Sequence, residues 1–189
     1  PARLVDAPPW EEGPHLEKLR RLNPVVQVPV LVLEDGAVMT ESGAIALFLT
    51  ERHPEPVLAP PPGDPLRPFF LRWLFFLTSG VYALFRFEDH PERLTGAPDA
   101  QEEVRDRLVA VRTAMLRQLD AAARAPWFLG EQQTLLDLYI AVMSYWRPRR
   151  AWFAQNCPRL FAIARQVESD PRLAPVFHRH FAGERNGAA

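Results

Sequence analysis

An acidic residue and a hydroxyl residue, Glu41 and Ser42, lie where an apolar helix is predicted to begin. The first N–H groups of a helix lack intrahelical partners and the helix dipole is positive there, so this end binds carboxylates and other anions. Val28 and Pro29 precede them in an extended apolar run, and extended backbone can hold a peptide-like ligand as an added strand. These four residues therefore predict a site for a small, peptide-like ligand that carries a carboxylate.

Each half of this prediction has a purely structural alternative. Serine and acidic residues are common at helix starts, so Glu41 and Ser42 are also explained as an N-cap, and both roles can coexist. A proline within a strand also marks a strand edge or a bulge, which explains Pro29 without a ligand. The residue types alone leave these alternatives open.

The elements that would position these residues form a small α/β domain predicted over residues 1–53. The hydrophobic pattern and the Asp-Gly pair, typical of a two-residue hairpin turn, predict its elements. They are, in order, a short strand at 3–6, a helical turn at 15–21, a strand at 28–33, a turn at 34–36, a strand at 38–39 and a helix from Thr40 or Glu41 to about Arg52.

A change of composition follows this domain. Residues 54–68 contain seven prolines and a glycine, which excludes helix or sheet interior and predicts a linker. The spacing of apolar residues then predicts an all-helical domain over residues 69–182 and a frayed tail at 183–189. Its five expected helices cover 69–87, 99–125, 135–147, 158–168 and 171–181.

The overall composition excludes several classes of partner. The chain has 22 basic and 23 acidic residues, a net charge of −1, which argues against nucleic acid or an anionic membrane as the main partner. The single cysteine, Cys157, allows no intrachain disulfide and no multi-cysteine metal site. We expect no metal, no membrane-spanning apolar run, and a cytoplasmic location.

The ordered set of motifs resembles the cytosolic glutathione transferase family. The family pattern has Asn-Pro, then Val-Pro-x-Leu, then Asp-Gly, then Glu/Gln-Ser-x-Ala-Ile. Residues 130–137 also resemble the family's Gly-Asp-x-x-Thr-x-Ala-Asp segment, so the resemblance covers both domains. The matching residues of the first domain are Asn23, Pro24, Val28, Pro29, Leu31, Asp35, Gly36, Glu41, Ser42, Ala44 and Ile45.

The resemblance implies a thioredoxin-like α/β domain, incomplete here, followed by an all-helical bundle domain, and glutathione as cosubstrate. It implies that a cis Pro29 exposes the Val28 backbone to the cysteinyl part of glutathione, and that Glu41 and Ser42 receive the γ-glutamyl end. Gln27 and Arg20 are candidates for the glycine end, with solvated loop residues as the alternative. The family fold begins with a βα unit that has no counterpart here, so we expect the thiol-activating Tyr, Ser or Cys in a segment before Pro1 and assign that role to no residue of this chain.

The helical domain would supply a hydrophobic pocket for a small electrophile. Aromatic residues crowd the helix at 69–87, and most are explained as core or dimer contacts. Tyr82, Arg86 and Trp146 are the candidates for the pocket. The family forms homodimers, and Arg72, polar within an apolar stretch, is the candidate for a contact near that interface.

Other reactive residue types are assigned structural roles. Thr134 and Asp137 form a capping-box pattern at a buried helix start. Cys157 is interpreted as a small buried residue. His178 and His180 fall on different helix faces, which disfavours a metal site, and the acidic cluster at 88–90 is expected to be a solvated helix end.

Three functions remain open. The first is a glutathione transferase that promotes attack of the glutathione thiolate on a hydrophobic electrophile. The second is a glutathione-dependent thiol-disulfide reductase or isomerase that uses the same half-site. The third is a non-catalytic binding or regulatory protein of the same fold.

Overall fold

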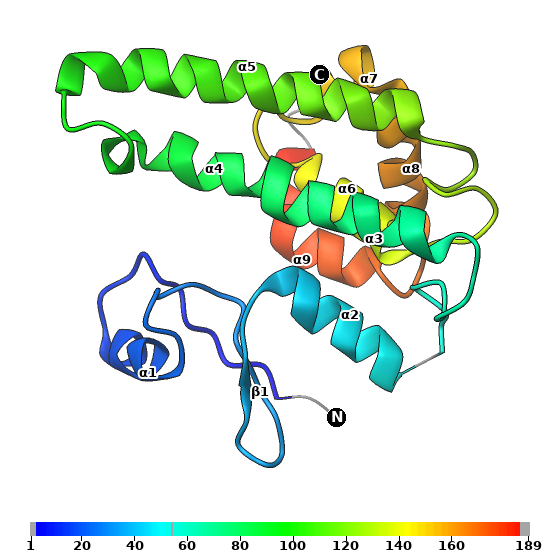
Figure 1. Ribbon diagram of the computed structural model, residues 1–189, viewed down its shortest axis with the longest axis horizontal. Helices are drawn as coiled ribbons and strands as arrows, with labels where there is room; N and C mark the ends of the chain where they lie inside the picture. Colours follow the sequence, from blue (N-terminus) through cyan, green and yellow to red (C-terminus); the bar gives the residue numbers. More distant parts are fainter. Residues whose placement is uncertain (1–2, 54, 186–189) are drawn as a thin grey trace. The chain divides into compact units, whose positions relative to one another are not determined.

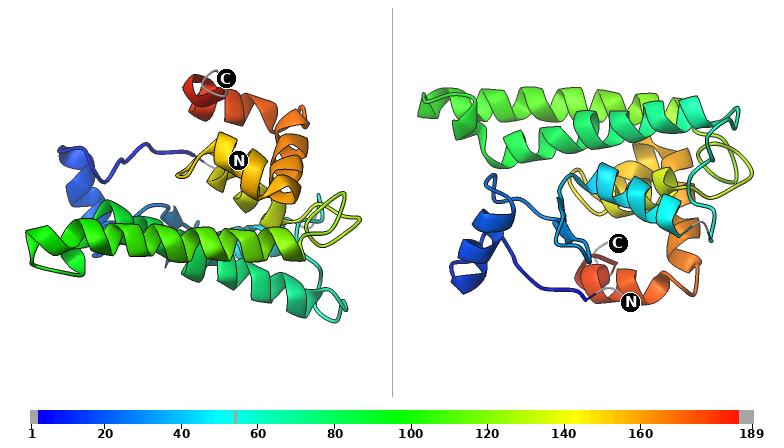
Figure 2. Two further views of the ribbon diagram at one scale, coloured as in Figure 1. Left: turned by 90° about the horizontal axis from the view of Figure 1, so that it is seen from above. Right: turned by 60° about the horizontal axis from the view of Figure 1, so that its bottom comes forward.

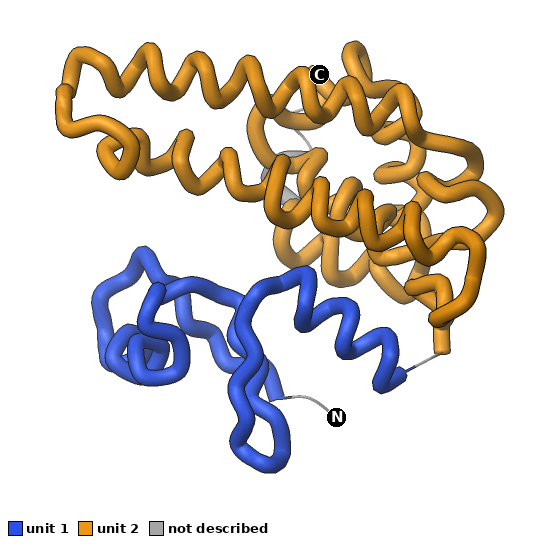
Figure 3. The backbone as a smooth tube through the Cα atoms, in the orientation of Figure 1, with its two compact units in different colours: residues 1–54 blue, residues 55–189 orange. Residues whose placement is uncertain are grey.

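The computed structural model describes residues 3–53 and 55–185 and divides into two compact units, residues 1–54 and residues 55–189 (Figures 1 and 3). We call them unit 1 and unit 2 and describe each by itself. The boundary between them lies in the proline-rich segment.

Unit 1 is a small α/β assembly. Its elements are α1 (Pro14–Leu22), β1 (Leu31–Val32), β2 (Val38–Met39) and α2 (Ser42–Arg52). The strands pair antiparallel, with Leu31 opposite Met39 and Val32 opposite Val38. In the turn, Asp35 Oδ1 accepts the N–H of Ala37 at 2.9 Å, and Gly36 has a φ of 86°, which glycine adopts without steric cost. The predicted hairpin is confirmed, but the N–H of Leu33 donates to the carbonyl of Ala37, so the loop between the strands has the three residues Glu34, Asp35 and Gly36 and not the two expected from the Asp-Gly pair.

Two predicted strands are corrected. Residues 3–6 form no strand, and Leu4 is 91% exposed. A strand needs a neighbour to bond its backbone, and no described segment pairs with these residues. For the same reason, the strand expected over 28–33 covers only Leu31–Val32, because its partner β2 is equally short.

Unit 2 is helical apart from an isolated bridge between Trp127 and Gly130. The helices α4 and α5 lie side by side, as both views of Figure 2 show. The helical elements described are α3 (Arg67–Phe75), the π-helix η1 (Phe76–Val81), α4 (Tyr82–Asp89), the short 3₁₀ turn η2 (Pro91–Arg93), α5 (Pro98–Ala122), α6 (Leu135–Met143), α7 (Arg150–Asn156), α8 (Pro158–Ser169) and α9 (Ala174–Arg185).

The helix pattern differs from the predicted five helices at three places. The helix expected to reach 147 ends at Met143, and α7 was not predicted because its seven residues are too short for a clear apolar period. The last helical element spans Ala174–Arg185 with a kink at Phe181, whose φ is −130°, so residues 183–185 of the expected frayed tail are helical. Residues 186–189 of that tail lie outside the described residues.

The long aromatic helix is interrupted by the π-helix η1. Two hydroxyls there donate to carbonyls one turn earlier: Thr78 to Leu74 at 2.8 Å and Ser79 to Phe75 at 2.6 Å. A Cβ on Gly80 would lie 2.7 Å from Met115 Cε of α5, so a larger residue here would require the flexible end of the Met115 side chain to move.

The continuous helical stretch Arg67–Asp89 corrects the expectation that the chain has no apolar run long enough to span a membrane. Its 23 residues and a mean hydropathy of 1.4 over its most apolar window make it long and apolar enough to cross a membrane by length and composition. Core helices of soluble proteins meet the same criteria, and Phe70, Leu77 and Val81 of this stretch are fully buried in the fold. We regard it as weak evidence for a membrane span.

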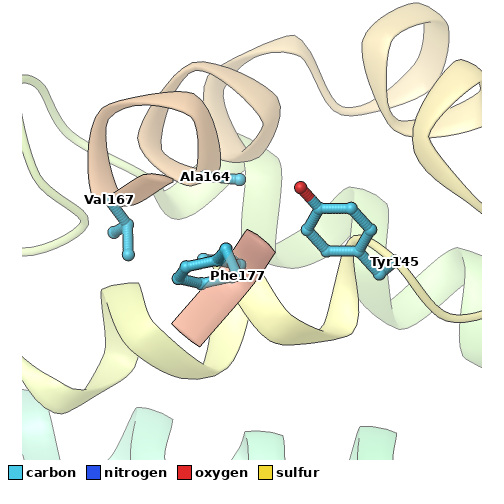
Figure 4. Close-up of a cluster of buried hydrophobic side chains, with 5 residues drawn as sticks. Tyr145, Ala164, Val167 and Phe177 are labelled. Atoms are coloured by element: carbon cyan, nitrogen blue, oxygen red, sulfur yellow. The ribbon is translucent and has the colours of Figure 1, made fainter. Parts of the chain in front are cut away.

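The core of unit 2 forms around α6, which packs against α8 and α3. Leu136 and Ile140 of α6 are buried. One cluster of this core joins Tyr145, just beyond α6, with Ala164 and Val167 of α8 and Phe177 of α9 (Figure 4). Helices distant in sequence are thus joined through the segment that contains α6.

The start of α6 is fixed by the buried carboxylate of Asp137. Its two oxygens accept the N–H of Phe128 at 2.8 Å, the N–H of Thr134 at 2.7 Å and the hydroxyl of Thr134 at 3.1 Å. The N–H of Leu135 donates to the carbonyl of Leu58 in the proline-rich segment at 2.8 Å. The predicted capping box is confirmed, with a further bond to Phe128.

Replacement of Asp137 by alanine should destabilise unit 2 strongly. Two buried backbone N–H groups would lose their acceptor, so we expect the free energy of unfolding to fall by about 2–4 kcal/mol. Urea unfolding followed by circular dichroism measures this change. Asp106→Ala, at an exposed site on α5, is the control, with an expected change within about 0.5 kcal/mol. Equal stability of the two variants would contradict the structural role of Asp137.

Candidate functional site

The loop that carries Val28 and Pro29 is fixed by the buried side chain of Asn23. Its Nδ2 donates to the carbonyl of Gln27 at 3.0 Å, and its Oδ1 accepts the N–H of Val25 at 3.2 Å. Both bonds close a tight turn between α1 and β1. The Val28–Pro29 peptide bond is cis, as the sequence predicted, and Val28 is 40% exposed.

The start of α2 has two features of a binding site. Glu41 occupies the N-cap position with a φ of 66°, a region that non-glycine residues rarely adopt and that concentrates at functional sites. Its carbonyl accepts the N–H of Ile45 at 2.9 Å. No side-chain bond caps α2 within the described chain, which corrects the expectation that Thr40 or Glu41 does so. The positive end of this helix is therefore left to a ligand or to solvent.

The six residues predicted to hold the peptide-like ligand all lie in unit 1. Glu41 and Ser42 are at the start of α2, and the exposed Arg20 is in the last turn of α1. The other three, Gln27, Val28 and Pro29, lie on the loop before β1. Gln27 is partly buried, and its carbonyl is engaged by Asn23, so only its side chain is a candidate for ligand contact.

In unit 2, the structure brings two of the three predicted pocket residues together. The rings of Tyr82 and Trp146 stack at a centroid distance of 5.0 Å and an angle of 27°. The ring of Phe85 meets Trp146 edge-on at 5.3 Å. Burial raises the pKa of the Tyr82 phenol, so it stays a neutral hydrogen-bond donor at neutral pH. Arg86 lies on the same helix, with an exposed side chain.

Two charged residues beside this aromatic group were not predicted. Glu88, expected in a solvated helix end, is buried and forms an ion pair with the fully buried Arg112 of α5, whereas Asp89 and His90 of the same cluster are exposed. A signal was present in the sequence: Arg112 falls on the apolar face of α5, between Leu108 and Leu116 at intervals of four. A charge at such a position needs a buried partner.

The remaining candidates give no catalytic group. No cluster of three or more His, Cys, Asp or Glu side chains that could hold a metal occurs among the residues searched, those at 3–53 and 55–185. Thr134 lines a surface hollow of about 500 Å³ between segments 57–66 and 124–134, but none of the nine predicted ligand-site residues does. Thr134 is itself engaged in the capping box.

Cys157 is fully buried, and burial raises the pKa of its thiol to about 12. We therefore predict that an aromatic disulfide reagent at about pH 8 leaves Cys157 unmodified in the folded protein, because the thiolate is the reactive form. The absorbance of the released thiol measures the reaction. The same protein unfolded in guanidinium is the control and should react fully. Fast modification of the native protein would show an accessible, reactive thiol instead.

Comparison with known proteins identifies the family. A family model described as the glutathione S-transferase N-terminal domain matches residues 1–52. The chain is 40% identical to the uncharacterised GST-like protein YncG of Escherichia coli over 182 residues, 95% of this chain and 87% of that protein. It is 28% identical to a maleylacetoacetate isomerase of Pseudomonas aeruginosa, over 79% of this chain and 70% of that protein.

Solved structures agree with this assignment. A glutathione S-transferase of Methylobacterium radiotolerans, crystallised with glutathione sulfonate, superimposes with a TM-score of 0.69 and 25% identity, over 88% of this chain and 78% of that one. The chain belongs to the glutathione transferase family. The predicted fold class, a thioredoxin-like α/β domain followed by an all-helical domain, is confirmed.

Proposed function

We propose that this protein is a glutathione transferase of the cytoplasm that promotes attack of the glutathione thiolate on a hydrophobic electrophile. The observation that carries the proposal is the start of α2, where Glu41 has positive φ and no side chain caps the helix. A free positive helix end beside an acid and a hydroxyl suits the carboxylate and ammonium of the γ-glutamyl group. The cytoplasm keeps glutathione and thiols reduced.

The rest of the glutathione molecule would extend from α2 toward the loop before β1. The exposed residue Val28, followed by Pro29, suits the cysteinyl residue as an added strand. Gln27 and Arg20 are assigned to the glycine carboxylate. The related transferase of Methylobacterium radiotolerans, crystallised with a glutathione derivative, supports glutathione as the ligand.

The electrophile would bind to unit 2 at the stacked rings of Tyr82 and Trp146, with Arg86 at its edge. A stacked, partly exposed pair of rings favours a flat aromatic or conjugated substrate, because such a substrate continues the stack. The neutral Tyr82 hydroxyl can donate a hydrogen bond to a polar substituent. The thiol-activating role is assigned to none of the described residues.

A second candidate is a glutathione-dependent isomerase, favoured by the similarity to a maleylacetoacetate isomerase. The two reactions differ in their products. A transferase releases the leaving group of chlorodinitrobenzene as chloride, whereas an isomerase returns glutathione unchanged and converts a cis unsaturated dicarboxylate to the trans form. Assays of both substrates with the full-length protein distinguish them.

The double substitution Glu41→Ala with Ser42→Ala should weaken glutathione binding. The lost charge-assisted hydrogen bonds at the start of α2 correspond to about 2–4 kcal/mol. Isothermal titration calorimetry measures the affinity of the wild type and the variant. Glu34→Ala, an exposed acid in the hairpin turn, is the matched control and should bind as the wild type does.

The variant Glu41→Gly separates the contribution of the Glu41 side chain to binding from that of its backbone conformation. Glycine accepts a φ of 66° without strain, so the variant should be at least as stable as the wild type and still lose affinity. If either the double variant or Glu41→Gly keeps wild-type affinity, the assignment of the γ-glutamyl site is wrong.

We also propose that the protein is a homodimer, with the surface of α3 at the interface. Phe69 and Phe75 of α3 are 54% and 62% exposed, which leaves large apolar rings in water. Arg72 lies between them in the chain, with its guanidinium over the Trp73 ring at 4.3 Å, and is the candidate for a contact at or near this interface.

Light scattering at micromolar concentration should give twice the monomer mass. Replacement of both rings, Phe69→Ser with Phe75→Ser, should shift the protein toward the monomer, because it removes apolar surface from the contact. Val176→Ser, at another exposed apolar position in unit 2, is the control and should leave the dimer intact. A monomeric wild type would contradict the proposal.

A further inference from the structure

A buried ion pair joins α4 to α5 in unit 2. Glu88 is 3% exposed and Arg112 is fully buried, and the two form a direct contact. The Arg112 Nε has no hydrogen-bond partner among the described residues. The carboxylate of Glu88 therefore compensates the buried positive charge of Arg112. Removal of one member of such a pair leaves the other charge uncompensated.

A third residue connects this pair to the turn after α6. Arg147 Nε lies 3.2 Å from Glu88 Oε1, and the same guanidinium pairs with Asp89. Arg147 directly follows Trp146 in the chain. The carboxylate of Glu88 therefore links the end of α4 to the side chain of the residue that follows Trp146.

The side chain of Trp146 is held by a second path that starts at the same arginine. The Arg112 guanidinium lies over the Phe85 ring at 4.2 Å, and the edge of Phe85 meets Trp146 at 5.3 Å. Trp146 in turn stacks on Tyr82. An ion pair with Arg147 and ring contacts through Phe85 thus both connect the Glu88–Arg112 pair to Trp146 and the residue that follows it.

We propose that Glu88 and Arg112 are positioning residues that fix Trp146 against Tyr82 and thereby shape the surface on which the second substrate binds. The inference rests on the proposed function for its kinetic consequence, but its structural content is the position of the indole. Neither residue touches the substrate. Both act through Trp146, whose ring and following residue they hold from two sides.

The chain supplies a matched comparison. Arg150 and Glu168 form a second nearly buried pair in unit 2, with bonds of 2.6 and 3.1 Å between the guanidinium and the carboxylate. Arg150 lies over the rings of Tyr145 and Phe161 and donates to Ser144 Oγ at 2.6 Å, and none of the interactions described joins it to Trp146 or Tyr82. Glu168→Gln weakens this second pair but leaves the bond from Arg150 to Ser144 and its position over Tyr145 in place. A general loss of stability should therefore follow from substitution of either glutamate, whereas displacement of Trp146 should follow only from substitution of Glu88.

The kinetic experiment compares Glu88→Gln with Glu168→Gln in the full-length protein, with chlorodinitrobenzene as the electrophile. Glu88→Gln should raise the KM for the electrophile by about threefold to tenfold and leave the KM for glutathione within about twofold. Glu168→Gln should leave both values within about twofold of the wild type. Equal effects of the two substitutions on the electrophile KM would overturn the proposal.

A spectroscopic readout does not depend on activity. The difference in fluorescence between a protein and the same protein with Trp146→Phe isolates the signal of Trp146. We expect acrylamide to quench this signal more in Glu88→Gln than in the wild type, and no such increase in Glu168→Gln. Unchanged quenching in Glu88→Gln overturns the positioning role. An inactive wild type overturns the proposed function, and the quenching comparison still decides the inference.

If Glu88→Gln does not fold, the double variant Glu88→Met with Arg112→Met takes its place. Replacement of a buried ion pair by apolar residues of similar volume preserves stability. This variant should also show increased quenching of Trp146, because it removes the anchor of Arg147 and the guanidinium above Phe85. A double variant with wild-type quenching overturns the proposal.

Discussion

Unit 2 depends on one buried group, the carboxylate of Asp137. It satisfies the backbone at the start of α6 and at Phe128, and α6 is the helix on which α3 and α8 pack. The turn after the other end of α6 contains Arg147, which pairs with a second buried carboxylate, that of Glu88. Buried acids with fixed partners thus lie near both ends of this helix.

Unit 1 is organised differently. Its regular structure is short, and its loop conformation depends on local bonds and unusual backbone angles rather than on a large core. The buried Asn23 closes the loop before Val28, and Glu41 takes a positive φ at the start of α2. The first feature rests on one polar side chain with two local bonds, whereas the second is a backbone angle that the residue type does not predict.

The sequence predicted best where a local rule decides the structure. The Asp35–Gly36 turn and the Thr134–Asp137 box are each defined by a few adjacent residues, and the cis Pro29 was implied by the resemblance to the family. It failed where a distant partner decides. Residues 3–6 have a strand pattern but no described neighbour to pair with. Glu88 lies in a helix end whose sequence predicts exposure to solvent. It is buried because α4 packs against α5, which brings its carboxylate to Arg112. The thiol-activating residue is beyond prediction from this chain, because no residue matches its motif.

The π-helix η1 has a consequence for how this protein can diverge. A π turn contains one residue more than an α turn, so every side chain after it is rotated by about 100° around the helix axis relative to the side chains before it. Tyr82, Phe85 and Glu88 all follow η1, at spacings of three. Loss of a single codon at Gly80 would turn all three away together, whereas substitutions would alter them one at a time. A single insertion or deletion within η1 is therefore enough to rotate the two aromatic side chains and Glu88 together.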